Sequence, residues 1–134
     1  MKEVNKETAL ITGGASGIGL SMGKRLAEAG MKVALADIEI PVLEEAVEEL
    51  KGLGHKAMGV HCDVSDITSV EEMKTQIEKE FGSPKVVCLN AGVGFGSSIS
   101  EATISDWEWV MGVNLWGVIH GLNTFLPAIK EMDE

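Results

Sequence analysis

The stretch ALITGGASGIGLSMGKRLAEAG, residues 9–30, holds the residues whose types and spacing point most directly to chemistry. An apolar run ends at Thr12 and gives way to glycines, after which apolar residues recur at helical spacing. The glycines are Gly13, Gly17 and Gly19. Gly13 can adopt the positive φ of a tight turn, and the later two leave no side chain between a helix N-terminus and an approaching phosphate. The turn therefore predicts a phosphate site, with a closely packed strand–helix turn as the alternative.

Asp37 ends the next apolar run along the chain. A carboxylate at this place accepts hydrogen bonds from the hydroxyls of an adenosine ribose and opposes a 2′-phosphate. Two like charges about 4 Å apart repel by roughly 4 kcal/mol at an effective dielectric of about 20. A third of that energy favours NAD over NADP about tenfold. Asp37 therefore predicts NAD as the cofactor, and a helix-capping aspartate is the alternative.

Short apolar runs alternate with segments of helical spacing. Strands are expected over residues 8–12, 32–37, 56–62 and 85–90, and helices over 17–29, 41–51, 69–81 and 105 to about 130. Capping-box spacing occurs at Ser69 with Glu72 and at Ser105 with Glu108. Pro127 predicts a kink in the last helix.

This element order, βαβαβαβα, is typical of a doubly wound α/β fold, in which near-continuously apolar strands form a parallel sheet buried on both faces. We expect a Rossmann-like sheet truncated at four strands. Because neither a repeat nor a linker interrupts the pattern, residues 1–134 are expected to form one incomplete domain. Ligands of such sheets bind beyond the carboxyl ends of the strands.

The composition narrows the function classes. A net charge of -10 without a basic patch argues against nucleic acid, and the acidic runs at 44–49 and 71–80 fit solvated helix faces. No segment reaches the roughly 18 apolar residues that span a membrane, and the N-terminus has no signal-peptide core. We therefore expect a cytoplasmic protein with Cys62 and Cys88 as reduced thiols.

Four short motifs together carry a resemblance to a known family. They are TGGASGIG at 12–19, DV at 63–64, NAG at 90–92 and VNLWG at 113–117. In this order the chain resembles the N-terminal half of the short-chain dehydrogenase/reductase family, whose members transfer a hydride between NAD(P) and an alcohol or carbonyl substrate. The resemblance covers essentially the whole chain.

The resemblance implies a set of residues that contact the dinucleotide: Gly13, Ser16, Gly17, Ile18, Gly19, Asp37, Asp63, Val64, Asn90, Ala91 and Gly92. Within this set Asp63 is expected at the adenine amino group, with the backbone of Val64 beside it. Asn90 begins the wall near the second ribose. Asp63 and Asn90 each follow an apolar strand, so they converge on one sheet edge, and loop capping is their alternative role.

Asn114 is the one residue that the resemblance implies for catalysis, where it helps to hold a water of the proton relay. It shares a predicted helix face with apolar residues: Trp107, Val110, Met111 and Val118. An amide on such a face needs a partner, so a structural hydrogen bond is the alternative. His55, His61 and His120 fall on separate elements and form no catalytic triad or metal set, and we expect no metal.

The family's Ser, Tyr and Lys have no counterparts in the chain, which contains no tyrosine. We therefore expect the N-terminal cofactor-binding portion of an NAD(P)-dependent oxidoreductase, inactive by itself. A fragment of a complete enzyme and a non-catalytic dinucleotide-binding module both fit. A methyltransferase-like domain that binds S-adenosylmethionine is a further alternative, opposed by the NAG and VNLWG motifs.

The last predicted helix has a second apolar stripe, formed by Trp109, Val113, Trp116 and Ile119. Two stripes on one helix require partners on two sides. The sheet is one of them, and a second copy of the chain is expected as the other. An open edge on the fourth strand also invites pairing. We therefore predict a homo-oligomer formed through the 105–130 helix.

Overall fold

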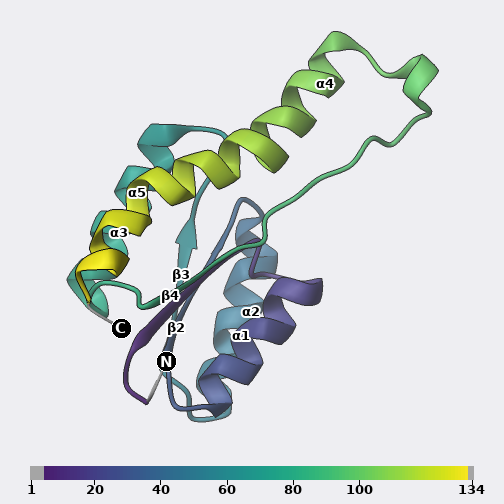
Figure 1. The fold of residues 1–134 in the computed structure, drawn as a ribbon. Helices are drawn as coiled ribbons and strands as arrows, with labels where there is room; N and C mark the ends of the chain where they lie inside the picture. Colours follow the sequence, from purple (N-terminus) through teal and green to yellow (C-terminus); the bar gives the residue numbers. More distant parts are fainter. Residues whose placement is uncertain (1–4, 133–134) are drawn as a thin grey trace.

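The computed structural model describes residues 5–132, which fold as one parallel sheet between two layers of helices (Figure 1). The elements are β1 (Thr8–Thr12), α1 (Gly17–Glu28), β2 (Lys32–Asp37), α2 (Ile40–Gly52), β3 (Ala57–His61), α3 (Ile67–Glu80), β4 (Val86–Leu89), a 3-10 turn η1 (Ile99–Glu101), α4 (Ile104–Met111), η2 (Gly112–Trp116) and α5 (Gly117–Glu131). The sheet order is β3-β2-β1-β4. The predicted Rossmann-like α/β fold is confirmed.

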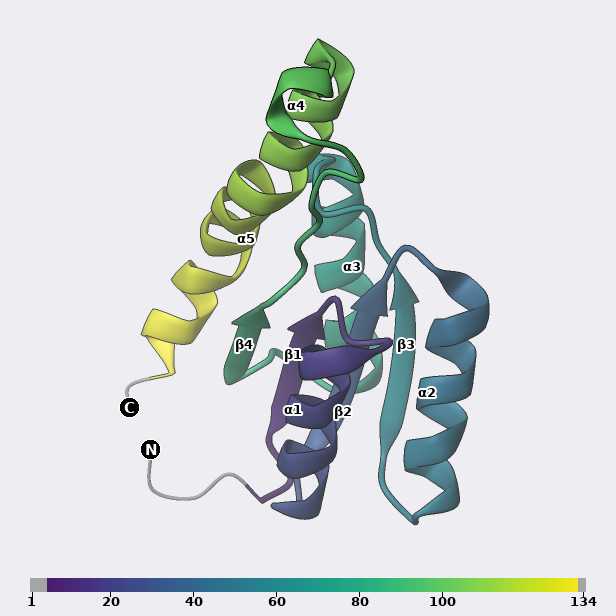
Figure 2. The ribbon, with the colours of Figure 1, turned by 90° about the vertical axis from the view of Figure 1, so that its right-hand side faces the viewer.

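The two faces of the sheet bury different side chains because successive residues of a strand point in opposite directions. Ile11, Val33 and Leu35 belong to the core under α1 and α2. Leu10 and Ala34 belong to the core under α3 and α5. Every residue of β1 is buried, as expected for a central strand covered on both faces. Figure 2 shows the helices on either side of the sheet and β4 at its edge.

Both predicted capping boxes are wrong. Asp66, not Ser69, caps α3, and its carboxylate accepts a hydrogen bond from the Thr68 N–H at 3.0 Å. Thr103 caps α4 by a reciprocal pair of bonds with Asp106. In each place several residues with capping side chains stand close together, and the one whose backbone is extended at the helix entrance becomes the cap.

The predicted 105–130 helix is a rod of three parts, in which a π-helical turn, η2, separates α4 from α5. The helix runs through Pro127 to Glu131, close to the expected end, and the kink expected at Pro127 stays a prediction. Proline at this place removes the hydrogen bond to the carbonyl four residues earlier, that of Asn123. Because Asn123 is exposed, water can replace that bond.

The π turn rotates the faces of the rod relative to one another, since it inserts extra residues into the helical repeat. Val113 and Ile129 pack against the core on the α3 side of the sheet, where Phe125 is buried. Trp109 and Trp116, of the same predicted stripe as Val113, are 53% and 52% exposed. The expectation of two continuous apolar stripes is therefore wrong, although the rod does have a buried and an exposed apolar side.

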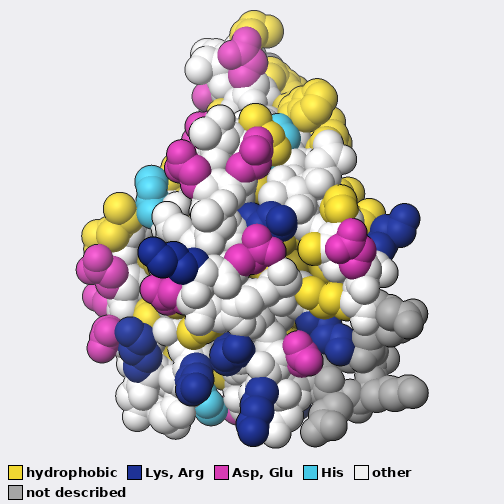
Figure 3. Space-filling view, turned by 90° about the vertical axis from the view of Figure 1, so that its left-hand side faces the viewer, with side chains coloured by type: hydrophobic (Ala, Val, Ile, Leu, Met, Phe, Trp, Pro, Cys, Tyr) yellow, Lys and Arg dark blue, Asp and Glu magenta, His cyan; other side chains and the backbone are white. Residues whose placement is uncertain are grey.

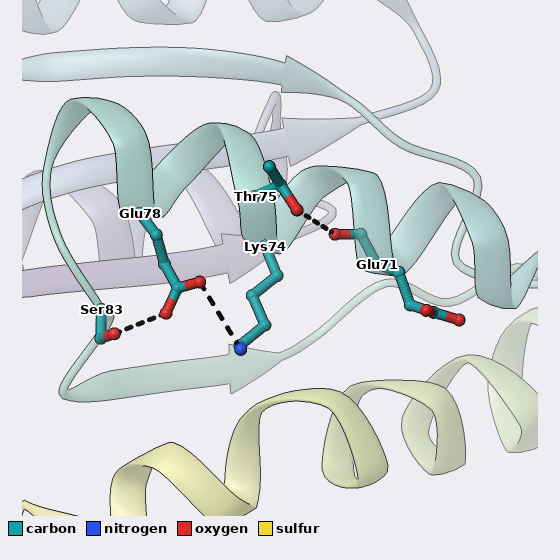
Figure 4. A network of polar contacts seen from close by, with 5 residues as sticks. All are labelled: Glu71, Lys74, Thr75, Glu78 and Ser83. Carbon is teal, nitrogen blue, oxygen red and sulfur yellow. Dashed lines mark hydrogen bonds and ion pairs between the residues drawn. The ribbon is translucent and has the colours of Figure 1, made fainter.

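A small polar network ties the end of α3 to the segment that leads into β4 (Figure 4). The Glu78 carboxylate accepts a hydrogen bond from Ser83 Oγ at 2.6 Å and lies 3.5 Å from Lys74 Nζ. Thr75 Oγ1 donates to the Glu71 carbonyl within the same helix. The Ser83–Glu78 bond lies near the amino end of β4, so it joins α3 to the segment that precedes this strand.

No helix within residues 5–132 is both long and apolar enough to cross a membrane.

We predict that Phe125→Ala lowers the free energy of unfolding by about 3–5 kcal/mol, because it removes a side chain that is only 2% exposed. Urea denaturation followed by far-UV circular dichroism measures the change. Leu122→Ala, on the exposed side of the same helix, is the matched control and should cost about 1 kcal/mol or less. Equal losses in both variants would contradict the packing of α5.

Candidate functional site

The order of the strands reverses between β1 and β4, and the chain segments that leave these two strands diverge at their carboxyl ends. The segment after β1 turns into α1. The segment after β4 runs out beyond the sheet and returns through α4 (Figure 1). In open α/β sheets ligands bind in the crevice at such a reversal.

The turn after β1 needs glycine at Gly13, which has a φ of 65°. Its neighbour Gly14 donates a hydrogen bond to the Ala36 carbonyl at 3.0 Å, which folds the turn back on β2. A Cβ on Gly19 would overlap the Gly13 carbonyl oxygen. A Cβ on Gly17 would meet no atom within 4 Å, although its φ of 55° also favours glycine. Close packing therefore accounts for Gly19, whereas Gly17 leaves open space at the helix start.

The first turn of α1 presents free donors. Ser16 is the N-cap, its side chain makes no capping bond, and the turn holds no acidic residue. No acceptor within residues 5–132 is recorded for the N–H groups of Gly17, Ile18 or Gly19. Ile18 is 75% exposed beside them. Unpaired N–H groups at the positive end of a helix dipole are suited to an anion.

The Asp37 carboxylate bridges the turn and the start of the next helix. One oxygen accepts from the Ala15 N–H at 3.1 Å, and the other accepts from the Glu39 N–H at 3.1 Å. The N-cap of α2 is Glu39 and that of α1 is Ser16, so Asp37 braces the segments before both helices and is not the helix cap considered as an alternative. A carboxylate offers about four acceptor sites, so each oxygen retains capacity for a ligand hydroxyl.

Asp63 lies in the turn that follows β3. Its Oδ1 accepts from the Ser65 N–H at 3.0 Å and from Ser65 Oγ at 2.6 Å. The Asp63 N–H donates to Ser69 Oγ at 3.0 Å. No partner within residues 5–132 is recorded for Asp63 Oδ2 or for the Val64 N–H. The turn is therefore internally braced and keeps one acceptor and one donor for a ligand.

Thr12 joins the glycine turn to the loop after β4. Its buried hydroxyl accepts from the N–H groups of Asn90 and Ala91, at 3.0 and 3.2 Å, and donates to the Cys88 carbonyl at 3.4 Å. In return Asn90 Nδ2 donates to the carbonyls of Thr12 and Gly13, at 3.2 and 3.3 Å. The sequence motifs imply no separate role for Thr12, but a hydroxyl that ends an apolar strand is a buried polar group that needs hydrogen-bond partners.

Asn114, on η2, holds the same loop further along. Its Oδ1 accepts from the Val93 N–H at 2.8 Å, and its Nδ2 donates to the Val93 carbonyl at 2.8 Å. The side-chain amide thus makes the structural hydrogen bonds that were the alternative to a relay role. Gly92 lies next to this amide, since a Cβ on Gly92 would stand 3.5 Å from Asn114 Oδ1.

The histidines do not gather at one place. No group of three or more metal-ligating side chains occurs within the described part of the chain. His120 contacts the site indirectly, because its Nδ1 lies 2.9 Å from the Val64 carbonyl oxygen. This contact could not be read from the sequence, since it joins residues far apart in the chain.

A cavity of about 700 Å³ lies between α1 and β4, lined by apolar side chains that include Ile18, Met22 and Val86. Cys88 lies on its wall. Burial raises the pKa of the Cys88 thiol, and burial is also the main cause of the raised pKa of Cys62. Both are free thiols that stay protonated at neutral pH, so neither is an activated nucleophile.

Comparison with known proteins decides the family. The model of the short chain dehydrogenase family matches residues 7–134. The chain belongs to this family. A C alpha-dehydrogenase of Sphingobium sp. strain SYK-6 is 40% identical over 130 residues, which cover 96% of this chain and 43% of that protein. The meso-2,3-butanediol dehydrogenase of Serratia marcescens is 34% identical over 126 residues, 93% of this chain and 49% of that protein.

A solved short chain dehydrogenase/reductase from Burkholderia phymatum, in complex with NAD, superposes with a TM-score of 0.95 at 36% identity. It covers 100% of this chain, and this chain covers 48% of it. The chain thus spans about half the length of the short-chain dehydrogenases that it matches. The family binds NAD(P), so the crevice between β1 and β4 lies in a dinucleotide-binding fold.

We predict that Thr12→Val destabilises this short-chain dehydrogenase fold by about 1–3 kcal/mol, because the Ala91 N–H loses its acceptor. Urea denaturation gives the energy, and hydrogen–deuterium exchange should show faster exchange at Ala91. Thr12→Ser, which keeps the hydroxyl, is the control and should leave Ala91 protected. Equal protection of Ala91 in the valine variant and the wild-type chain would contradict the role of Thr12.

Proposed function

We propose that the chain binds NAD at the carboxyl edge of its sheet, as the N-terminal cofactor-binding portion of an oxidoreductase that acts on an alcohol or carbonyl substrate. The observation that carries the proposal is the convergence of three features on one edge: free N–H donors at the start of α1, the Asp37 carboxylate and the Asp63 turn. The three features follow β1, β2 and β3, which are neighbours in the sheet. In that order they would suit the pyrophosphate, the ribose and the adenine of a dinucleotide.

In this proposal the pyrophosphate lies against the first turn of α1, with Ser16 and the N–H groups of Gly17, Ile18 and Gly19 as donors. Asp37 accepts from the adenosine ribose. Asp63 Oδ2 accepts from the adenine amino group, and the Val64 N–H donates to the ring. The second ribose lies along the wall made by Asn90, Ala91 and Gly92.

The bound cofactor would exchange a hydride with the substrate. The residues of this chain would bind and orient it, because the chain has no tyrosine to serve as the family's general acid and base. We therefore propose that the 134-residue chain binds the cofactor without turnover. Asn114 would act by holding the Val93 backbone, and so the wall of the site, in place. Its share in a proton relay stays a prediction.

The proposed cofactor preference rests on Asp37. In NADP a 2′-phosphate would stand where Asp37 meets the ribose, and the repulsion favours NAD by about tenfold. Calorimetric titration of the chain with NAD and with NADP is expected to show this preference. Asp37→Asn keeps the size of the side chain but removes its charge. This variant should weaken the binding of NAD by about tenfold and abolish the preference for NAD over NADP.

Glu44→Gln is the matched control for the Asp37 variant, because it removes one negative charge from the exposed surface of α2. This variant should keep the preference of the wild-type chain. Tighter binding of NADP by the wild-type chain would overturn the role of Asp37. Absence of binding by either dinucleotide would overturn the cofactor site itself.

We also propose that the chain associates with itself through the exposed side of the α4–α5 rod, which we term the outer rod surface. Its large apolar side chains are between 44% and 53% exposed: Trp109, Met111, Leu115, Trp116, Leu122 and Leu126. Figure 3 shows hydrophobic side chains along the upper right edge, over α4 and the start of α5. Large exposed apolar side chains gathered on one rod favour an interaction surface, and within residues 5–132 the outer edge of β4 has no paired strand.

Sedimentation equilibrium tests this association. The wild-type chain should form dimers or larger species at high concentration, and Trp109→Glu should shift it toward monomer, since a carboxylate cannot be buried cheaply in an apolar contact. Leu53→Ser, which changes an exposed apolar residue at the end of α2, should leave the distribution unchanged. A wild-type chain that stays monomeric at high concentration would contradict the proposal.

A further inference from the structure

His120 reaches from α5 to the turn that follows β3. Its Nδ1 lies 2.9 Å from the Val64 carbonyl oxygen, and the two residues are 56 positions apart in the chain. A carbonyl oxygen can only accept, so Nδ1 is the donor and carries the hydrogen. The ring is half-buried and also lies beside Trp116, with ring centroids 6.1 Å apart.

The start of α5 fits closely against this turn. A Cβ on Gly117 would stand 2.7 Å from Val64 Cγ2, a distance that real Cβ atoms essentially never show. A Cβ on Gly112 would lie 3.4 Å from Ser65 Cβ. The helix and the turn are therefore in direct contact, and His120 adds one directed hydrogen bond to that contact.

The other bonds of the turn come from within it or from α3. Ser69 Oγ accepts from the Asp63 N–H, the Asp66 N–H donates to the Asp63 carbonyl at 3.1 Å, and Ser65 binds Asp63 Oδ1. Within residues 5–132, the Val64 carbonyl accepts a hydrogen bond from His120 alone. Val64 is buried, so an unpaired carbonyl there would be costly and the turn would move to satisfy it.

We propose that His120 is a positioning residue for the adenine end of the cofactor site. By holding the Val64 carbonyl, its ring sets the peptide planes of the turn and so keeps Asp63 Oδ2 and the Val64 N–H aimed at an adenine. The inference rests on the proposed function, because it takes the turn after β3 as the adenine site. Removal of the ring donor should weaken recognition of the adenine amino group while the other contacts of the dinucleotide remain.

The test compares NAD with nicotinamide hypoxanthine dinucleotide, in which a carbonyl replaces the adenine amino group. The wild-type chain should bind NAD about tenfold more tightly, because Asp63 accepts from the amino group and not from a carbonyl. His120→Leu should reduce this ratio to about twofold or less. His120→Asn places an amide nitrogen where Nδ1 stands, and should restore the ratio. His120→Gln places its nitrogen one bond farther out and should not.

His55→Leu is the matched control, because His55 lies before β3, at the opposite end of that strand from the turn. This variant should keep the wild-type ratio. Equal weakening of both dinucleotides in His120→Leu, with an unchanged ratio, would show that His120 supports only the fold. Failure of His120→Asn to restore the ratio would likewise overturn the role of the Nδ1 donor.

A measurement without cofactor separates this inference from the proposed function. Hydrogen–deuterium exchange at the Ser65 and Asp66 amides should speed up in His120→Leu and stay at the wild-type rate in His120→Asn and His55→Leu. If the wild-type chain binds neither dinucleotide, the cofactor site fails while exchange still decides whether His120 holds the turn. Unchanged exchange in His120→Leu would overturn the inference whatever the chain binds.

Discussion

The Thr12 hydroxyl holds together the place where β1 and β4 part, and the geometry of the crevice between these two strands depends on it. Parallel neighbours in a sheet come from distant parts of the chain, so nothing local fixes how their exits lie relative to one another. One hydroxyl takes two N–H groups from the loop after β4, and Asn90 returns two bonds to the carbonyls of the glycine turn. These bonds join the two segments that border the crevice, so the position of either segment fixes the other.

The α4–α5 rod supports the same edge from outside the sheet. Its π turn brings Asn114 to the Val93 backbone, and within the next two turns of helix Gly117 and His120 contact the segment after β3. Loops rarely hold a fixed shape by themselves, because each ordered residue loses conformational entropy. Here one rod contacts both the loop after β4 and the turn after β3. A change in the rod would therefore alter the geometry at both ends of the proposed dinucleotide site.

The sequence predicted the fold well because burial on both faces leaves a strong signal. The strands at 8–12 and 32–37 end where expected, and the other two are one residue shorter at each end. It was harder to predict which of several neighbouring residues caps a helix. Ser69 and Asp66 can both cap a helix, and only the path of the backbone decides between them. The π turn leaves no recognisable pattern of apolar residues in the sequence. Because it interrupts the helical repeat, the residues of the 105–130 helix lie on other faces than predicted. The partners of Thr12 and His120 are tertiary contacts that no local pattern encodes.

Two uncovered apolar surfaces of the described chain border β4. The cavity between α1 and β4 is on one face of the sheet, and the rod is on the other, whereas α2 packs against β3 at the opposite edge. The loop after β4 also leans outward, where Phe95 meets Trp107 edge-on with ring centroids 4.8 Å apart. In the proposed binding mode the second ribose lies along Asn90–Gly92, so the nicotinamide end would point to this same edge. A partner that covered the apolar surfaces beside β4 would then also border the nicotinamide end of the proposed site, far from the glycine turn.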